Sequence, residues 1–342
     1  MLVQENISLK KLNTFGIDVS SKYFAGFSTV DQLQELLEFI KPQTTNYKPQ
    51  TLILGGGSNI LFTKNFDGLV LKNEITGIKI IKEDEHYVYV KVGAGENWHQ
   101  FVLHCIKNNW AGVENLSLIP GNVGASPMQN IGAYGAELKE VCYCIDAFNI
   151  KEKKIIEFSV NDCEFGYRDS VFKRKYKNEF IITNVVYRLN KIPTFNISYG
   201  AIGHELEKLG VKQISIKAIS DAVINIRSSK LPDPNVIGNA GSFFKNPHVS
   251  SATFKKLKEK FSKIVGYVQE NSDYKLAAGW LIEDCGWKGF RKGDAGCHAW
   301  QSLVLVNYGN AKGNEIYDLS EEILQSVKEK FGVMLEREVN IN

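Results

Sequence analysis

The chain of 342 residues has 44% hydrophobic and 23% charged residues, a balance that is typical of globular proteins and excludes an intrinsically disordered chain. This length exceeds one ordinary hydrophobic core, so two or three folded units are expected. A formal net charge of +3 does not indicate a nucleic-acid partner. Because no apolar run is long enough for a membrane span or a signal peptide, we expect a cytoplasmic protein.

The first predicted helix covers residues 29–42. Thr29 and Gln32 have the spacing of a capping box, in which side chains bind N–H groups of the first turn. Apolar residues then recur every three or four positions up to Ile40, and Pro42 would end the helix. The pattern predicts a surface helix with one buried face.

Along the rest of the chain, predicted strands alternate with predicted helices, and no internal repeat occurs. The predicted class is therefore α+β. The basic run at 254–261 is predicted to be the solvated face of an amphipathic helix. The last helix should end at Gly332, because glycine adopts the left-handed conformation that closes a helix. The other predicted elements are strands over 51–54, 86–95 and 179–189, a helix from Trp98 and a helix over 314–332.

Two glycine-rich stretches carry the first chemical signal. In LGGGSN, three glycines at 55–57 leave backbone N–H groups accessible and the next two side chains add donors, a pattern that can bind a pyrophosphate. It matches neither the Rossmann nor the P-loop pattern, so by itself it also fits a tight turn. The second stretch, 119–135, is long and rich in small residues, as in loops that line a ligand. Together they predict a bound dinucleotide.

A set of polar residues suits a substrate with phosphates or a carboxylate, which arginine can bind through two parallel hydrogen bonds. Among them, Ser242 lies in GNAGSFFKNP between small residues and two phenylalanines, which predicts a hydroxyl at a site rather than on a surface. Taken singly, each cation also fits a surface charge or a local salt bridge. The set is Arg168, Tyr199, Arg227, Lys230, Ser242, Lys245 and Asn246.

The six cysteines show no metal-binding spacing, so we expect reduced core residues and no metal site. They are Cys105, Cys142, Cys144, Cys163, Cys285 and Cys297.

Seven motifs occur in the order found in the UDP-N-acetylenolpyruvoylglucosamine reductase (MurB) family, which the chain resembles over nearly its whole length. Tyr267 ahead of KLAAGW, together with the SYG segment, resembles the type I form. The motifs are NTFGID (13–18), LGGGSN (54–59), IPGNVGASPMQNIGAYG (119–135), YRDS (167–170), GNAGSFFKNP (238–247), KLAAGWLIE (275–283) and LEREV (335–339).

The resemblance implies a two-part FAD-binding module of the vanillyl-alcohol-oxidase type with a separate α+β substrate-binding domain. The first FAD-binding subdomain is expected over 1–67, joined by 333–342, and the second over 68–225. The substrate-binding domain is expected over 226–332.

The resemblance also implies the reaction and its participants. NADPH gives a hydride to noncovalently bound FAD and leaves, and the enolpyruvyl UDP-sugar is then reduced to UDP-N-acetylmuramate, a peptidoglycan precursor. The expected partners are these small molecules alone, with no nucleic acid, membrane or obligate protein partner. The residues implied to hold FAD are Gly55, Gly56, Gly57, Ser58, Asn59, Ile119, Pro120, Gly124, Asn130, Gly132 and Tyr134.

Three residues match the family's catalytic positions. Arg168 would stabilise the negative charge that develops on the enolpyruvyl group, as preoriented cations do. Glu338, in LEREV, would assist, and it would be protonated because two anionic groups could hardly lie together. Ser242 would be the general acid, since a carbanion-like intermediate is basic enough to take a proton from a hydroxyl held in contact with it.

Further positions match residues that hold the sugar nucleotide: Tyr199, Arg227, Lys230, Asn246, Tyr267 and Gln301. The sequence departs from the family at three places. Arg337 replaces a proline and Asn340 an arginine, which alters the charge expected near the flavin, and Ala125 stands where a serine is often found.

Three other functions remain open at this point. A serine hydrolase would use Ser242 as nucleophile with His298 or His248 as base, but the GxSxG elbow is absent, and His298 also fits a packed, hydrogen-bonded core residue. Another FAD-dependent oxidoreductase of the same fold usually tethers its flavin to a histidine or cysteine, and neither glycine-rich stretch contains one. A non-catalytic nucleotide-binding protein would explain the glycines but not Ser242 with Glu338.

Overall fold

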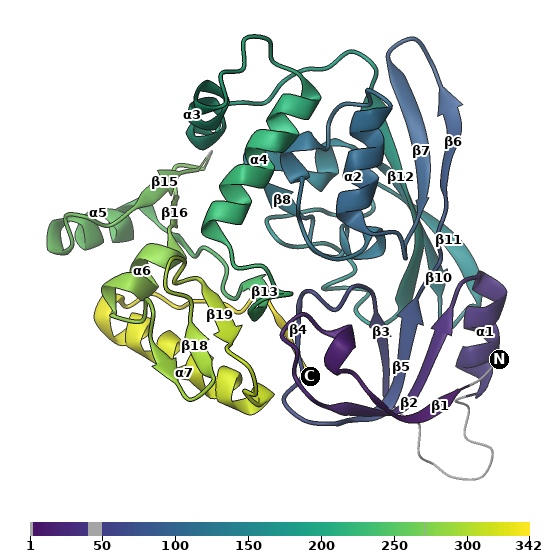
Figure 1. Cartoon of the computed structure of the whole chain (residues 1–342), viewed down its shortest axis with the longest axis horizontal. Coiled ribbons are helices and arrows are strands. Elements are labelled where there is room, and N and C mark those ends of the chain that lie inside the picture. Colours follow the sequence, from purple (N-terminus) through teal and green to yellow (C-terminus); the bar gives the residue numbers. More distant parts are fainter. Residues whose placement is uncertain (1–2, 40–49, 270) are drawn as a thin grey trace. The chain divides into compact units, whose positions relative to one another are not determined.

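The computed structural model describes residues 3–39, 50–269 and 271–342 (Figure 1). These residues fall into two compact units. Unit 1 takes the described part of Met1–Ile7 together with Ser21–Gly56 and Asp67–Ser229. Unit 2 takes Ser8–Ser20, Gly57–Phe66 and Lys230–Asn342. The chain therefore crosses between the units several times. The functional division into three domains stays a prediction.

The first sheet of unit 1 has four strands in the order β1-β2-β5-β3, with β3 parallel to β5. Helix α1 (Val30–Phe39) packs on it through Leu33 and Leu36, as the apolar spacing predicts. Gln32 donates its N–H to the Thr29 hydroxyl, so the predicted cap forms; Ile40 and Pro42 lie outside the described residues. The strands are β1 Gln4–Ser8, β2 Ser20–Phe27, β3 Gln50–Leu54 and β5 Phe66–Asn73.

The second sheet of unit 1 is antiparallel, in the order β11-β10-β12-β7-β6. Helix α2 (Trp98–Lys107) begins with Asn97 as its cap and buries Trp98 and Phe101 against Tyr187 of the sheet. The strands predicted over 86–95 and 179–189 are β7 and β12. The strands are β6 Ile78–Glu83, β7 Tyr87–Gly93, β10 Cys142–Asn149, β11 Lys154–Ser159 and β12 Phe180–Asn190.

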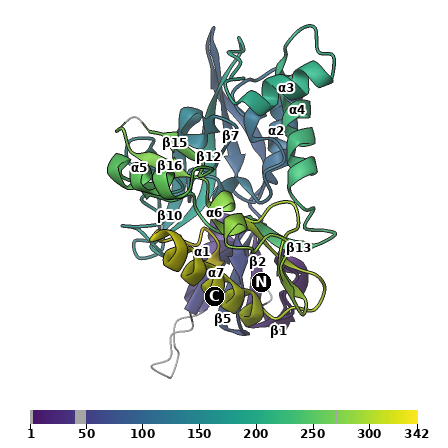
Figure 2. The ribbon, with the colours of Figure 1, turned by 90° about the vertical axis from the view of Figure 1, so that its left-hand side faces the viewer.

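Two further helices of unit 1, α3 (Gly200–Lys208) and α4 (Ile216–Lys230), pack together around Ile202 and Val223. Figures 1 and 2 both draw α4 beside α2. The remaining short elements of this unit are β8 Gly132–Ala133, β9 Ala136–Glu137 and the 3-10 helices η2 Glu114–Leu116, η3 Val123–Ala125 and η4 Leu138–Glu140.

Unit 2 is built on an antiparallel sheet in the order β13-β19-β18-β17, covered by α7 (Gly313–Phe331). Helix α7 ends at Gly332 with φ 67°, as predicted. A second sheet has the order β14-β16-β15, and β4 pairs in parallel with β20. The elements are β4 Ile60–Leu61, β13 Gly238–Ser242, β14 His248–Val249, β15 Gly266–Val268, β16 Tyr274–Leu276, β17 Arg291–Lys292, β18 Ala295–Cys297, β19 Val304–Asn307, β20 Asn340–Ile341, η1 Lys10–Leu12, α5 Ser251–Lys260 and α6 Ala278–Asp284.

Two smaller expectations, on the basic run and on the burial of the cysteines, agree with the structure. The basic run at 254–261 lies on α5, which buries Leu257 and exposes its lysines. All six cysteines are free, and all except Cys285 are buried. None of the helices that the structure describes has the length and apolar character needed to span a bilayer.

Candidate active site

The first glycine-rich turn connects β3 to β4 and brings the backbone close to other segments. A Cβ on Gly56 would lie 2.8 Å from the Cα of Gly121, so the two glycine-rich stretches touch within unit 1. Among the described residues, the N–H groups of Gly56, Gly57 and Ser58 have no hydrogen-bond acceptor. Adjacent unpaired N–H groups in a turn suit the oxygens of a diphosphate. The turn therefore fits the diphosphate of a dinucleotide.

We expect Gly56→Ala to weaken FAD retention about 5- to 150-fold, because the added methyl group pushes residues 121 and 122 away and such overpacking costs about 1–3 kcal/mol. Gly203→Ala is the matched control, since a Cβ there meets nothing within 4 Å and lies on α3. The ratio of flavin to protein absorbance after gel filtration measures retention. Equal ratios in both variants would contradict a tight approach at Gly56.

The second glycine-rich stretch is fastened to the beginning of α2. Gly121 accepts the N–H of Trp98 (3.0 Å), and the Asn122 side chain donates to the carbonyl of Gly95 (2.7 Å). A Cβ on Gly124 would lie 2.5 Å from that of Ala94, which only glycine avoids. The loop is thus fastened to the segment that joins β7 to α2, as a cofactor-lining loop requires.

Asn130, expected to hold the cofactor, uses its side chain inside the protein. It is fully buried, and its amide donates to the Gly166 carbonyl (3.0 Å) and to Glu137 (2.9 Å). Its Oδ1 accepts the N–H of Lys139 (3.0 Å). The side chain therefore shapes the loop, and any contact of Asn130 with the cofactor stays a prediction.

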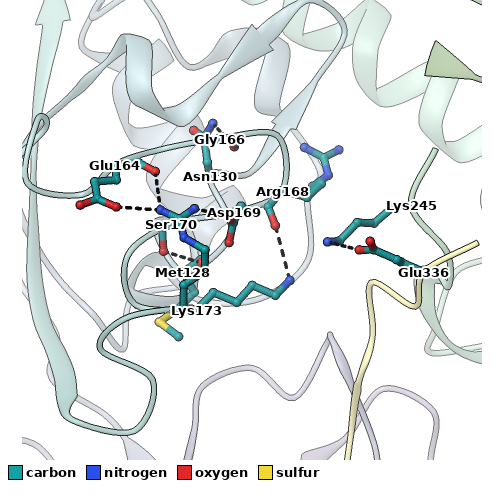
Figure 3. Close-up of polar contacts among 11 residues, drawn as sticks. Met128, Asn130, Glu164, Gly166, Arg168, Asp169, Ser170, Lys173, Lys245 and Glu336 are labelled. Carbon is teal, nitrogen blue, oxygen red and sulfur yellow. Dashed lines mark hydrogen bonds and ion pairs between the residues drawn. The ribbon is translucent and has the colours of Figure 1, made fainter. Parts of the chain in front are cut away.

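Arg168 lies in a segment tied to the second glycine-rich stretch (Figure 3). Its guanidinium donates to the carbonyl of Gly132 (2.6 Å), and the hydroxyl of Ser170 donates to the carbonyl of Met128 (2.7 Å). The backbone of Arg168 is left-handed, with φ 54°. In Figure 3 its guanidinium points away from Asp169 and Glu164. These contacts preorient the cation beside the loop predicted to line the flavin.

Arg227, on α4, lies in the same unit and is partly buried. Its Nε donates to the carbonyl of Leu118 (3.2 Å), and its side chain lies close enough to that of Tyr134 to interact with it electrostatically. Burial lowers the pKa of Arg227, the Tyr134 side chain opposes this, and the positive charge of Arg168 lowers it further. Among the described residues no carboxylate pairs with Arg227. A partly buried cation near a second cation without a carboxylate partner favours an anionic ligand.

Tyr199 lies next to Tyr134, and the contacts that hold it there could not be read from the sequence. The rings of Tyr134 and Tyr199 meet edge to face at 5.2 Å. The buried Asn115 amide donates to the carbonyls of Tyr134 and Asn196 (both 2.9 Å), and the Asn196 amide donates to the Gly135 carbonyl (2.8 Å). The segment before α3 is therefore fastened to the glycine-rich loop. No local pattern in the sequence around Asn115 indicates these contacts.

In unit 2, Ser242 ends β13 beside Val304 of β19. Gly241, with φ 69°, allows the irregularity that precedes it, and the buried rings of Phe243 and Phe244 fix the packing behind it, as expected. Phe243 accepts the N–H of Glu338 at its carbonyl (2.8 Å). The two predicted catalytic residues of this unit therefore lie on hydrogen-bonded neighbouring segments.

The other predicted residues are divided between the units. In unit 2, Asn246 Oδ1 accepts the N–H of Ala278 (2.9 Å), and Gln301 lies on the connection between β18 and β19. Lys230 and Tyr267 are exposed. Lys245 pairs with Glu336 (2.8 Å), also drawn in Figure 3. The structure places Arg168, Tyr199 and Arg227 in unit 1 and Lys230, Ser242, Asn246, Tyr267, Gln301 and Glu338 in unit 2.

The histidines offer little support for a hydrolase. His298 is buried, as expected, and its backbone N–H donates to the Val304 carbonyl (2.9 Å), but its Nδ1 has no hydrogen-bond partner in the described part of the chain. The expected hydrogen bond of the ring is therefore absent at Nδ1 in the described residues, and the ring lies edge to face with that of Trp300 (5.7 Å between centroids). Among the described residues, no histidine ring is hydrogen-bonded to Ser242.

Comparisons with known proteins agree with this arrangement. Residues 233–342 match the model of the UDP-N-acetylenolpyruvoylglucosamine reductase C-terminal domain, and residues 21–150 match that of an FAD binding domain. The reductase of that name from Flavobacterium johnsoniae is 48% identical over 342 residues, 100% of either chain. The one from Amoebophilus asiaticus is 49% identical, covering 100% of this chain and 99% of its own.

The chain belongs to the UDP-N-acetylenolpyruvoylglucosamine reductase family.

This reductase family also includes a solved structure with the same fold, that of the Thermus caldophilus enzyme (MurB). It has a TM-score of 0.67 and 21% identity, with 99% of each chain covered. The predicted α+β class with an FAD-binding module is confirmed, and the chain is an FAD-dependent oxidoreductase. The roles of its individual site residues remain predictions.

Two of the three departures from the reductase family pattern, Arg337 and Asn340, have local explanations, and Ala125 has none in the structure. Arg337 donates through Nε to the Ser320 hydroxyl (2.8 Å) and pairs with Glu321 (2.6 Å), so α7 binds its charge. The side chain and backbone N–H of Asn340 both donate to the carbonyl of Asn59 (2.9 and 3.2 Å). Asn340 therefore helps to join β20 to the segment before β4, and its side chain carries no charge.

Proposed function

We propose that the chain reduces UDP-N-acetylglucosamine enolpyruvate to UDP-N-acetylmuramate, with NADPH as the source of the hydride. The product is a precursor of peptidoglycan. Full-length relatives that carry the reductase name support this reaction. The observation that carries the assignment is the pairing of the Ser242 and Glu338 segments through the Glu338 N–H and the Phe243 carbonyl.

FAD would be held by the turn at 55–59 and the loop at 119–135. In the turn, the N–H groups of Gly56, Gly57 and Ser58, which have no acceptor among the described residues, fit its diphosphate. When bound, FAD supplies hydride transfer between NADPH and the substrate double bond.

The cations of unit 1 provide electrostatic stabilisation. An enolpyruvyl ether is conjugated to its carboxylate, so hydride addition at the terminal carbon leaves negative charge spread into that carboxylate. Arg168 is preoriented by the Gly132 carbonyl, and Arg227 has no carboxylate partner in the described residues, so both suit this anion. Tyr199 encloses the substrate beside Tyr134.

The residues of unit 2 complete the reduction and hold the sugar nucleotide. Ser242 holds the proton that is delivered to the carbon next to the carboxylate, and Glu338, protonated, supports the same anion. Lys230, Asn246, Tyr267 and Gln301 bind the sugar nucleotide and its phosphates.

The test is the spectrum of the purified holoenzyme. We expect flavin absorbance that is bleached by NADPH under anaerobic conditions and that returns when the enolpyruvyl sugar nucleotide is added, with UDP-N-acetylmuramate as product. Bleached protein whose colour returns only with oxygen would indicate an oxidase and contradict the proposal. The contacts of the site do not distinguish NADPH from NADH as the hydride donor. NADH is therefore the matched control donor.

A further inference from the structure

Segment 116–118, just before the second glycine-rich stretch, is held between α2 and α4. From α2, the Trp98 indole N–H donates to the carbonyl of Leu116 (2.8 Å). From α4, Ser220 shares a hydrogen bond with Ser117 (2.8 Å). Leu118 is bound from both helices, because its N–H donates to Nδ1 of His99 (3.0 Å) and its carbonyl accepts from Nε of Arg227 (3.2 Å).

Leu118 would not adopt its conformation without these contacts. Its φ is 58°, in the left-handed region, which costs a residue with a side chain about 1–2 kcal/mol. Such backbone persists only where surrounding contacts over-determine it. His99 and Arg227 supply those contacts on the two sides of one residue, and we call His99, Leu118 and Arg227 the Leu118 clamp.

The clamp fixes the protonation state of His99. A ring nitrogen that accepts a hydrogen bond carries no proton, so the imidazole is neutral with its proton on Nε2. A doubly protonated ring could not accept the N–H of Leu118. Protonation of His99 therefore breaks the clamp at its α2 side.

We infer that His99 is a positioning residue for the anionic substrate, because it holds Leu118 in the conformation whose carbonyl orients Arg227. This inference rests on the proposed function, in which Arg227 binds the substrate. His99 itself touches the backbone of Leu118 and acts through Arg227.

The charges around His99 give the clamp a pH dependence. Burial lowers the pKa of His99 below its ordinary value of 6.5, and the facing charge of Arg227 lowers it further. Arg227 in turn faces Tyr134 and Arg168, while segment 116–118 has no ionisable side chain. Because the folded-state pKa is lowered, the clamp is intact above 6.5 and is lost as pH falls through the lowered pKa.

Three variants of the FAD-loaded enzyme separate this role from a structural one. His99→Ala removes the acceptor. His99→Asn keeps an acceptor at the position of Nδ1 but cannot titrate. His104→Asn is the matched control, because His104 lies on the same helix and packs on Trp110 instead.

Binding of UDP-N-acetylmuramate, measured by calorimetry, is the first readout. We expect the dissociation constant to rise about tenfold in His99→Ala, because this variant loses one hydrogen bond. It should stay within about threefold of the wild-type value in His99→Asn and His104→Asn. Flavin reduction by NADPH should be unchanged in the control His104→Asn. Below pH 6.5, acid should weaken binding less in His99→Asn than in the wild type.

The tautomer of His99 in the wild-type holoenzyme is the second readout, and it does not depend on variant folding. Nitrogen-15 imidazole spectra, assigned by the signal lost in His99→Asn, should show an unprotonated Nδ1 at neutral pH. A protonated Nδ1, wild-type binding by His99→Ala, or no rescue by asparagine would each overturn the clamp. If the wild-type enzyme bound neither the enolpyruvyl substrate nor the product, the proposed function would fail instead.

Discussion

Replacing Ser242 with alanine should leave reduction of the flavin by NADPH intact and slow reduction of the enolpyruvyl sugar nucleotide about 10²–10⁴-fold, the range of a lost general acid. The two half-reactions differ because only the second needs a proton on carbon. The hydroxyl lies at the end of β13, and its backbone is fixed by the buried phenylalanines that follow. Removing one oxygen therefore leaves the fold and the flavin site unchanged.

Stopped-flow absorbance separates these half-reactions, first with NADPH alone and then with substrate added to the reduced enzyme. Ser262→Ala is the matched control, an exposed serine of the same unit. Both steps should keep wild-type rates in that variant. If Ser242→Ala slowed both half-reactions by the same factor, the serine would be structural and another group would supply the proton.

The elements of this fold could be predicted where a local signal decides them. The Thr29–Gln32 cap and the left-handed Gly332 mark helix ends that depend on adjacent residues alone. Alternation in 86–95 sufficed for β7 because one face of that strand is buried. The run of three glycines also predicted the turn at 55–59. Gly57 there has a left-handed backbone, which glycine adopts readily and other residues do not.

What the sequence could not predict depends on contacts between distant segments. Arg227 was predicted as a substrate residue, but its bond to Leu118 joins residues separated by 109 positions and uses a left-handed leucine. No periodicity marks such a residue, since the strain is offset by tertiary contacts. His99 was read only as part of a helix, because a histidine that accepts one backbone N–H looks like any other in sequence.

The membership of the two compact units also depends on contacts between distant segments. Residues 8–20 and 57–66 belong to the same unit as the C-terminal third. That membership is set by single contacts such as the N–H of Thr14 on the Gly57 carbonyl and that of Asn239 on the Thr14 carbonyl (both 3.0 Å). The sequence motif NTFGID was recognised, but nothing in it indicates which segments it joins.

Replacing Arg168 with alanine should retain FAD and its reduction by NADPH, while reduction of the enolpyruvyl sugar nucleotide falls about 10²–10³-fold, as for a lost preoriented group that stabilises developing charge. The guanidinium donates to the Gly132 carbonyl, so it is aimed before substrate binds. Arg168→Lys should recover only part of the rate, because an ammonium keeps the charge without the planar fork.

Arg174→Ala is the matched control for Arg168. Arg174 lies in the same region of unit 1 and forms exposed ion pairs with Asp169 and Glu164, and such surface pairs contribute only about 0–1 kcal/mol. We expect full activity and a nearly unchanged melting temperature from it. Loss of flavin from Arg168→Ala, with Arg174→Ala unaffected, would instead assign Arg168 to the structure of the loop at 128–132 and leave the anion to Arg227. That outcome would move the electrostatic role from one cation to the other, because Arg227 has no carboxylate partner among the described residues and could stabilise the charge alone.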